Sequence, residues 1–318
     1  MEHRKIWERY PGYELVRRYS AWIVRSCFRS VTVEGREHIP TDGGALLLAP
    51  NHCATLMDPM MTLFGFGGDV GFGARSDIFS NPKTARKLYW LKILPIARER
   101  NGLSEVAKNF EVFDEIVDCL RHDLPFCLYA EGRHRAERGM LPVKKGIFRV
   151  AKQALDELGK PVRVLPMGLD YEYFFRGQGR AAIRFGEPID IGEYFASHAD
   201  LPEPEIYRSL CEELRNRDLA LIGRIPERRH GRIFLRILAS ILMLPVFLVC
   251  AVGSLLIWVP QAIIVSKLKD KAWTHTVRFV IHMLLPVLWP FHIFFERILR
   301  YWLELVEDLK KKPSEEAL

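Results

Sequence analysis

A long uncharged segment near the C-terminus constrains this chain more than any other feature. Residues 237–265, ILASILMLPVFLVCAVGSLLIWVPQAIIV, contain no charged side chain. The segment is longer than the roughly 20 apolar residues that a helix needs to cross a bilayer. A second apolar run at 277–299 carries a few charges, and Pro286 and Pro290 interrupt it. We therefore expect a hydrophobic membrane hairpin here, with a re-entrant or surface-lying segment as the alternative.

The charge of the chain also favours a membrane. The formal net charge is +7 and the isoelectric point is near 9.1, which suits nucleic acid, an anionic membrane surface or an anionic substrate. No aromatic–basic RNA motif or recognition-helix pattern is present, so we expect no nucleic-acid partner. Arginines crowd the linker 223–232, which we interpret as the cytoplasmic border of the membrane segment. This predicts a phospholipid membrane as partner, with the preceding domain on its cytoplasmic face.

The N-terminal residues 1–30 form the next segment, and they lack the apolar core of a signal peptide. Within residues 12–30, apolar side chains recur at roughly helical spacing and arginines flank them. This pattern predicts an amphipathic helix that associates with the membrane interface. The alternative is a helix packed on the domain with solvated arginines. Six scattered cysteines form no C-x-x-C pair and no zinc spacing, so we expect a reducing compartment and no metal site.

Residues 31–222 alternate between strand and helix patterns. We expect strands at 31–35, 45–50, 70–74, 93–97, 125–132, 161–171 and 181–191. We expect helices after Asp58-Pro59 and at 82–92, 102–122, 144–158 and 203–220, with Ser104 as an N-cap. Such alternation indicates an α/β domain with a mixed, largely parallel sheet flanked by helices. The predicted organisation is therefore an N-terminal helix (1–30), this domain, and a basic linker, membrane segments and charged tail (223–318).

His52 and Asp58 stand where the buried strand LLLAP ends. In α/β sheets, the turn after a strand is where ligand sites form. A neutral imidazole there can accept a proton from a hydroxyl, and a carboxylate can fix its tautomer and stabilise the imidazolium. No serine lies in a G-x-S-x-G context, so the pair indicates that the substrate supplies the hydroxyl. Six positions separate the two residues, so Asp58 has to fold back to reach His52.

The stretch NHCATLMDP, which holds this pair, resembles the first motif of the glycerolipid acyltransferases. These are the 1-acylglycerol-3-phosphate and glycerol-3-phosphate O-acyltransferases, and the five-residue gap resembles their N-H-x5-D-P branch. Three further stretches resemble the later motifs in the same order. They are ILPIARER (93–100), YAEGRHRAERGMLPVKKG (129–146) and VLPMGLDY (164–171). Ala130 stands in place of the family's usual proline. The resemblance covers roughly residues 30–220.

The resemblance implies a membrane-bound O-acyltransferase of phospholipid biosynthesis. It would move a fatty acyl group from acyl-CoA or acyl-carrier protein to glycerol-3-phosphate or 1-acylglycerol-3-phosphate, and it would need no cofactor. His52 and Asp58 would be catalytic. The expected substrate-binding residues are Arg98, Glu131, Gly132, Arg133, Arg135 and Lys144. Guanidinium groups suit a phosphate dianion because they offer paired donors. Glu131 would orient an arginine or a substrate hydroxyl, or pair with Arg149.

Two alternatives stay open at this point. One is an acyltransferase for another lyso-lipid, such as a lyso-aminolipid. The other is a catalytically silent lipid-binding membrane protein of the same fold, which the departures at Ala130 and His134 motivate.

Overall fold

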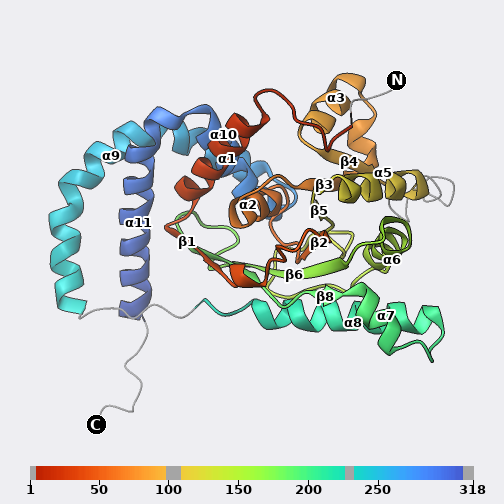
Figure 1. Ribbon diagram of the computed structural model, residues 1–318. Coiled ribbons are helices and arrows are strands. Elements are labelled where there is room, and N and C mark those ends of the chain that lie inside the picture. The colour runs from red at the N-terminus through yellow and green to blue at the C-terminus, as the bar shows by residue number, and fades with distance from the viewer. Residues whose placement is uncertain (1–4, 98–108, 226–232, 311–318) are drawn as a thin grey trace, which may run out of the picture. The chain divides into compact units, whose positions relative to one another are not determined.

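The computed structural model describes residues 5–97, 109–225 and 233–310 (Figure 1). Internal contacts divide the chain into two compact units. The first comprises residues 1–21, 32–170 and 182–224, and the second comprises residues 22–31, 171–181 and 225–318.

An eight-stranded sheet runs in the order β1-β7-β6-β2-β5-β3-β4, and β8 pairs with β6. β2 is parallel to β5 and β6, β3 is parallel to β4 and β5, and β8 is antiparallel to β6. The expected mixed, largely parallel sheet is therefore confirmed. The strands are β1 (Ser30–Glu34), β2 (Ala45–Pro50), β3 (Gly71–Arg75), β4 (Ile93–Ile96), β5 (Phe126–Cys127), β6 (Val162–Tyr171), β7 (Arg180–Phe185) and β8 (Ile189–Asp190).

β2 lies at the centre of the sheet because its six residues can all be buried. The sequence ALLLAP has no polar side chain, and every residue of the strand is buried. Its register with β6 pairs Ala45 with Val162 at one end and Pro50 with Met167 at the other. An apolar run without alternation is typical of a parallel strand covered on both faces. The carboxyl end of this central strand leads directly to Asn51 and His52.

Amphipathic helices accompany the sheet in the first unit. They are α2 (Met57–Phe66), α3 (Pro82–Trp90), α5 (Asn109–Arg121), α6 (Gly146–Leu158), α7 (Ile191–Ser197) and α8 (Glu203–Leu221), and α1 (Tyr13–Cys27) spans both units. Figure 1 shows α5 and α6 side by side, and both contact β2. α6 buries an apolar face made of Ile147, Phe148, Val150, Ala151 and Ala154. The expected helices are confirmed within the described residues, while Ser104 lies outside them.

Two expected strands are shorter than the sequence pattern predicted. The run 181–191 is wrong as one strand, because Gly186, Glu187 and Pro188 separate β7 from β8. Proline has no N–H for a ladder, and the Gly186 N–H donates to the carbonyl of Pro166 instead. The run 125–132 contributes only the two residues of β5. Beyond β5, the Leu128 N–H still donates to the carbonyl of Leu48 before the chain turns into a loop.

The second unit is built mainly from α9 (Ile233–Lys267), α10 (Thr274–Leu284) and α11 (Trp289–Lys310). Within the described part of the chain, α9 alone is long and apolar enough to cross a membrane as one helix. α10 and α11 pass the same test only as a pair, and a bend of 101° separates them. The break includes Pro286, as expected, whereas Pro290 lies in the first turn of α11 and does not interrupt the helix. α9 contacts both α10 and α11, and the membrane hairpin expected from the two apolar runs stays a prediction.

Candidate active site

Asn51 ties the end of β2 to β6 through its side chain. Its Oδ1 accepts from the Leu169 N–H at 2.7 Å, and its Nδ2 donates to the Leu169 carbonyl at 3.1 Å. The amide therefore pairs with β6 just beyond the last backbone partners, Pro50 and Met167. Asn51 is buried, so these bonds are shielded from water. The backbone is free to leave the sheet at this point, and His52 is the first residue to do so.

His52 and Asp58 are in direct contact. His52 Nδ1 lies 2.7 Å from Asp58 Oδ2, and the His52 side chain is 18% exposed while that of Asp58 is fully buried. A carboxylate accepts hydrogen bonds only, so Nδ1 carries the proton in this bond. Nε2 is then the ring nitrogen with a lone pair available for a proton. The predicted meeting of the two residues is confirmed.

A tight turn brings Asp58 back across the five intervening residues. Thr55 has a φ of 50°, in the left-handed region, and Asp58 lies in the first turn of α2. The same Asp58 oxygen accepts the N–H groups of Cys53 at 2.8 Å and Ala54 at 2.7 Å. A carboxylate at a helix N-terminus is also favoured by the helix dipole. The turn and the carboxylate therefore stabilise each other.

Cys53, beside His52, is not a suitable nucleophile. The side chain is buried, and burial raises the pKa of its thiol well above the ordinary value. A thiol rather than a thiolate reacts poorly. The His52 Nδ1 that faces this turn is already bonded to Asp58.

The loop after β5 holds the backbone of His52 from both sides. Glu131 Oε1 accepts the His52 N–H at 2.7 Å, and the Arg135 N–H donates to the His52 carbonyl at 3.1 Å. Glu131 Oε2 accepts the Leu141 N–H, also at 2.7 Å. Burial raises the pKa of the Glu131 carboxyl. Glu131 thus contacts two backbone N–H groups, which the sequence did not predict; the sequence suggested an arginine, a substrate hydroxyl or Arg149 as its partner.

Two aromatic side chains of the same loop lie beside the His52 ring. The Tyr129 ring centroid is 4.3 Å from that of His52, and the Tyr129 hydroxyl is 3.2 Å from Thr62 Oγ1. Burial raises the pKa of Tyr129 well above its ordinary value, so this phenol stays neutral. The His134 ring lies 5.5 Å from His52 in an edge-on arrangement. His52 is therefore flanked by rings, and its position is set by packing as well as by hydrogen bonds.

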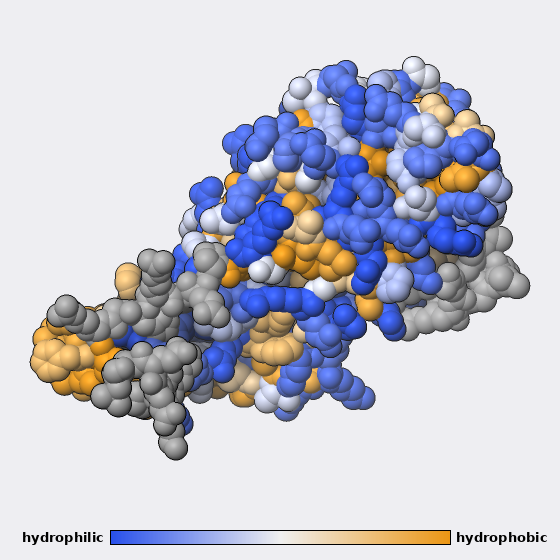
Figure 2. Space-filling model, turned by 90° about the horizontal axis from the view of Figure 1, so that it is seen from below, coloured by the Kyte–Doolittle hydropathy of each residue, from blue (hydrophilic) through white to orange (hydrophobic). Residues whose placement is uncertain are grey.

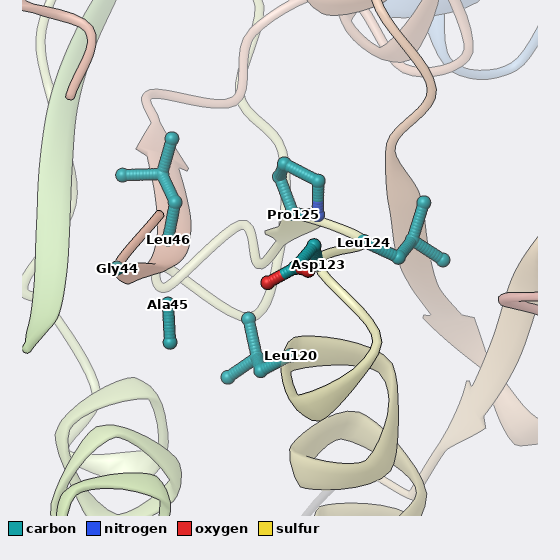
Figure 3. Close-up of a pocket in the computed structure, with 7 residues that line it drawn as sticks. All are labelled: Gly44, Ala45, Leu46, Leu120, Asp123, Leu124 and Pro125. Atoms are coloured by element: carbon teal, nitrogen blue, oxygen red, sulfur yellow. The ribbon is translucent and has the colours of Figure 1, made fainter. Parts of the chain in front are cut away.

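A small cavity lies at the other end of β2 (Figure 3). Its volume is about 20 Å³, and it is lined by Gly44, Ala45, Leu46, Leu120, Asp123, Leu124 and Pro125. A space of that size accommodates about one water molecule. Ala45 begins β2, whereas His52 follows its carboxyl end, so this cavity is separate from the His52–Asp58 pair.

Part of this chain is similar to known proteins. Residues 30–170 match the family model described as acyltransferase. Over 104 residues, the chain is 27% identical to glycerol-3-phosphate O-acyltransferase 1 of Saccharomyces cerevisiae, covering 32% of this chain and 13% of the relative. Over 127 residues, it is 28% identical to glycerol-3-phosphate O-acyltransferase 2 of the same yeast, covering 39% and 17%. The matched regions therefore span less than a fifth of either curated relative.

A solved structure supports the same fold. The 1-acyl-sn-glycerophosphate acyltransferase PlsC from Thermotoga maritima superposes with a TM-score of 0.50 at 20% sequence identity. The match covers 68% of this chain and 81% of that one.

Over residues 30–170, these matches support a glycerolipid acyltransferase family.

The predicted substrate-binding residues differ in how much of their surroundings the structure describes. Gly132, with a φ of 69°, and the exposed Arg133 and Arg135 lie on the loop that holds His52. The guanidinium of Arg135 pairs with Glu137 at 3.2 Å. Lys144 is exposed, and its N–H closes the loop by donating to the Ala130 carbonyl at 2.8 Å. Arg98 lies outside the described residues.

Sequence reasoning missed three contributors to the candidate site around His52. Asn51 was read only as part of a motif, although a lone amide between a buried strand and a histidine was a usable signal. Tyr129 was read only as part of a strand. His134 was noted as a departure from the family pattern, but no contact with His52 was expected. The ring positions depend on the loop fold, which no spacing in the sequence specifies.

Proposed function

We propose that this protein is a membrane-bound O-acyltransferase of phospholipid biosynthesis. It moves a fatty acyl group from acyl-CoA or acyl-carrier protein to the hydroxyl of glycerol-3-phosphate or 1-acylglycerol-3-phosphate. The observation that carries the proposal is the 2.7 Å contact between His52 Nδ1 and Asp58 Oδ2, which leaves Nε2 as a proton acceptor. The family match and the relatives named above support the same activity.

The proposed reaction uses His52 as a general base. Nε2 takes the proton of the acceptor hydroxyl as its oxygen attacks the thioester carbonyl carbon. The carbon–sulfur bond then breaks, and the thiolate leaves with the electron pair and takes the proton from the imidazolium. Asp58 stabilises the imidazolium and fixes the ring, as a carboxylate does in a serine-hydrolase triad. The thioester is already activated, so the proposal requires no cofactor or metal.

Cations on and near the His52 loop are proposed to bind the acceptor phosphate. Arg133, Arg135 and Lys144 belong to the loop region that adjoins His52, and Arg98 follows β4 in sequence. Gly132 and Glu131 would shape the loop around the acceptor. Arginine suits this task because its planar donors pair with phosphate oxygens. The relatives' names include both glycerol-3-phosphate and its 1-acyl ester, so both acceptors belong in the first assay.

The membrane part of the proposal rests on the apolar C-terminal helices. α9 exposes a long series of apolar side chains, and only 17% of its most apolar 18 residues are buried. The arginines of residues 223–232 support a cytoplasmic location for the domain that precedes them. The N-terminal helix is proposed to lie at the membrane–water interface on the cytoplasmic side.

The decisive experiment measures acyl transfer by the purified protein in lipid vesicles. Radiolabelled acyl-CoA is offered with glycerol-3-phosphate, 1-acylglycerol-3-phosphate or a lyso-aminolipid. General-base catalysis contributes roughly 10²–10⁴-fold, so His52→Ala is expected to lower turnover by at least about 10²-fold. His198→Ala, at the end of α7, serves as the histidine control.

The folded state of each variant is checked by circular dichroism. Near-wild-type turnover by folded His52→Ala would rule out the base assignment. Transfer to none of the acceptors by the folded wild-type protein would instead support a silent lipid-binding protein.

A further inference from the structure

α9 presents an apolar surface that is too long for an upright crossing of a bilayer. Exposed apolar side chains run from Phe234 to Ile264, and no charged residue lies between Ile237 and Val265. At 1.5 Å per residue, Phe234 to Ile264 spans about 45 Å, against a hydrocarbon core of roughly 30 Å. Figure 2 shows hydrophobic side chains gathered at the end of the view where α9 lies.

α11 runs antiparallel beside the first half of α9. Arg236 near the start of α9 pairs with Asp308 near the end of α11. The rings of Phe247 and Trp302 lie 4.5 Å apart. Ser254 Oγ and His292 Nδ1 are 2.9 Å apart, close to the start of α11. From Arg236 to Ser254, α9 therefore lies side by side with α11, and the two helices form one layer of the second unit.

The polar face of α11 holds the segment 171–181 of the second unit, which comprises the non-helical loop between β6 and β7 and the strand ends beside it. Arg297 Nε donates to Gln178 Oε1 at 3.0 Å, and the Arg300 guanidinium donates to the Gly177 carbonyl. Gln178 is fully buried, and its Nε2 also donates to the Ser26 carbonyl at 2.7 Å. The loop joins β6 to β7, and β7 begins only two residues after Gln178.

Gly177 shows how closely this loop fits against α11. A Cβ at this position would lie 2.2 Å from Glu296 Oε2 and 2.8 Å from Arg278 Cζ. Glu296 and Arg278 are buried and pair at 3.3 Å. Only a residue without a side chain can approach this ion pair so closely. The loop is therefore an integral part of the second unit.

The same face of α11 reaches water near its C-terminal end. Arg176 of the loop pairs with Glu307 at 3.3 Å, and their side chains are 52% and 55% exposed. Irregular backbone and exposed charges do not occur within hydrocarbon, unless protein or a water-filled cavity surrounds them. The loop-binding side of α11 thus belongs at the aqueous boundary of a membrane. α9 shares its layer from Arg236 to Ser254, so α9 cannot cross the bilayer over that length.

We propose that the second unit is a monotopic lipid-binding hairpin. α9 lies along one leaflet with its apolar outer side among the acyl chains, and the turn after α9 stays on the same side of the membrane as the 171–181 loop. The exposed Lys267, Lys269 and Lys271 at this turn reach the phosphate level of that leaflet. This inference rests on the membrane association in the proposed function, and it selects the surface-lying arrangement over a hairpin that spans the bilayer.

Cysteine labelling in sealed phospholipid vesicles tests the arrangement. The background is the full chain with Cys211→Ser, because the other five cysteines are buried. Lys269→Cys reports on the turn after α9, Arg176→Cys on the loop, and Leu242→Cys on the lipid-facing side, where Leu242 is 71% exposed. A membrane-impermeant maleimide is added outside the vesicles, before and after detergent.

The proposal expects equal labelling of Lys269→Cys and Arg176→Cys before detergent. Leu242→Cys should react only after detergent, because acyl chains cover it. Protection of Lys269→Cys where Arg176→Cys reacts would overturn the proposal, since the turn would then lie across the bilayer. Labelling of Leu242→Cys before detergent would overturn it as well.

Two further readouts separate this inference from the proposed function. Flotation of the same vesicles reports membrane association, and its failure would overturn both the membrane part of the function and the hairpin. Acyl transfer is measured on the same preparation. Missing activity with intact flotation and same-side labelling would reject the enzyme and support the hairpin.

Discussion

Asp58 accepts three hydrogen bonds through a single carboxylate oxygen. Oδ2 receives His52 Nδ1 and the N–H groups of Cys53 and Ala54, all within 2.8 Å. One oxygen therefore determines both the shape of the turn and the orientation of the imidazole. Hydrogen bonds to a charged acceptor are roughly twice as strong as neutral ones, so the turn is held firmly before substrate binds.

Asp58→Asn is expected to lower activity strongly and stability moderately. An amide directs either its oxygen or its NH₂ at these donors, and the neutral group stabilises an imidazolium less well. We expect at least a tenfold loss of kcat and a loss of about 1–3 kcal/mol in the free energy of unfolding. Kinetics and urea unfolding measure the two effects. Unchanged kcat would mean that another group orients His52.

Asp218→Asn is expected to stabilise the protein, and more so as the pH rises. Asp218 is buried on α8, its Oδ1 accepts from the Met167 N–H at 2.9 Å, and its Oδ2 has no hydrogen-bond partner. Burial raises the pKa of Asp218 well above 3.8. The folded state therefore binds a proton that the unfolded state releases, and stability falls from pH 3.8 up to the raised pKa.

The stabilising effect of Asp218→Asn should grow by roughly 1.4 kcal/mol per pH unit in that window. Urea unfolding at pH 4, 5.5 and 7 measures it. Leu214→Ala, one helical turn earlier on the same buried stripe, is the control and should destabilise at every pH. An Asn variant whose effect does not change with pH would show that Asp218 is not protonated in the folded protein.

Single residues also show how far the sequence could predict the site. His52 and Asp58 were predicted from their place after an apolar strand, where polar side chains are unusual, and Glu131 was implied by the resemblance of its motif. The partners of Glu131 were not predicted, since backbone N–H groups have no signature in a sequence. The meeting of His52 with Asp58 depended on the positive φ of Thr55, a residue that rarely adopts that conformation.

At the scale of elements, neighbouring strands approach so closely that glycine is required. A Cβ on Gly71 in β3 would lie 2.6 Å from Cδ2 of Phe126 in β5. Phe126 is fully buried, so its ring cannot swing into solvent. β3 and β5 pair in parallel at this point, with Gly71 opposite Phe126. The missing side chain of Gly71 provides the space that the ring of Phe126 fills.

Gly71→Ala is therefore expected to destabilise the protein by about 1–3 kcal/mol through overpacking. Gly146→Ala is the matched control, because nothing lies within 4 Å of a Cβ at Gly146 and the residue begins α6. The control should be neutral or slightly stabilising, since alanine favours a helix. Urea unfolding compares the two variants, and equal stability would contradict the overpacking argument.

The elements that the sequence predicted well are those with a long, consistent pattern. The uncharged run indicated α9, and the apolar faces indicated α5 and α6. The division of 181–191 into β7 and β8 was missed, because β8 owes its existence to pairing with β6 rather than to its own two residues. The segment 171–181 gave no sign of its role, since its partners Ser26, Arg297 and Arg300 all lie more than a hundred residues away in sequence.

At the scale of the whole molecule, charge and apolar surface act together on membrane binding. The net charge of +7 attracts anionic lipid, while the exposed side of α9 removes apolar area from water. Salt weakens only the first effect, because the Debye length falls to about 3 Å at 1 M. The two contributions can therefore be separated by ionic strength.

Flotation with anionic phospholipid vesicles is expected to persist in 1 M NaCl. Neutral vesicles should bind the protein as well, with lower affinity at low salt. A protein held by its arginines alone would be released by salt and would ignore neutral vesicles. Release of this protein under those conditions would contradict the role assigned to α9.

Backbone groups take part in each hydrogen bond that holds the loop from Glu131 to Lys144 around His52. The Arg135 and Lys144 contacts use N–H groups, and Glu131 reaches the N–H groups of His52 and Leu141. Apart from proline, any amino acid can supply such an N–H. The exposed side chains of this loop, such as Arg133 and Arg135, can therefore be replaced without removing the backbone hydrogen bonds that hold His52, so acceptor preference can change there while the imidazole keeps its position.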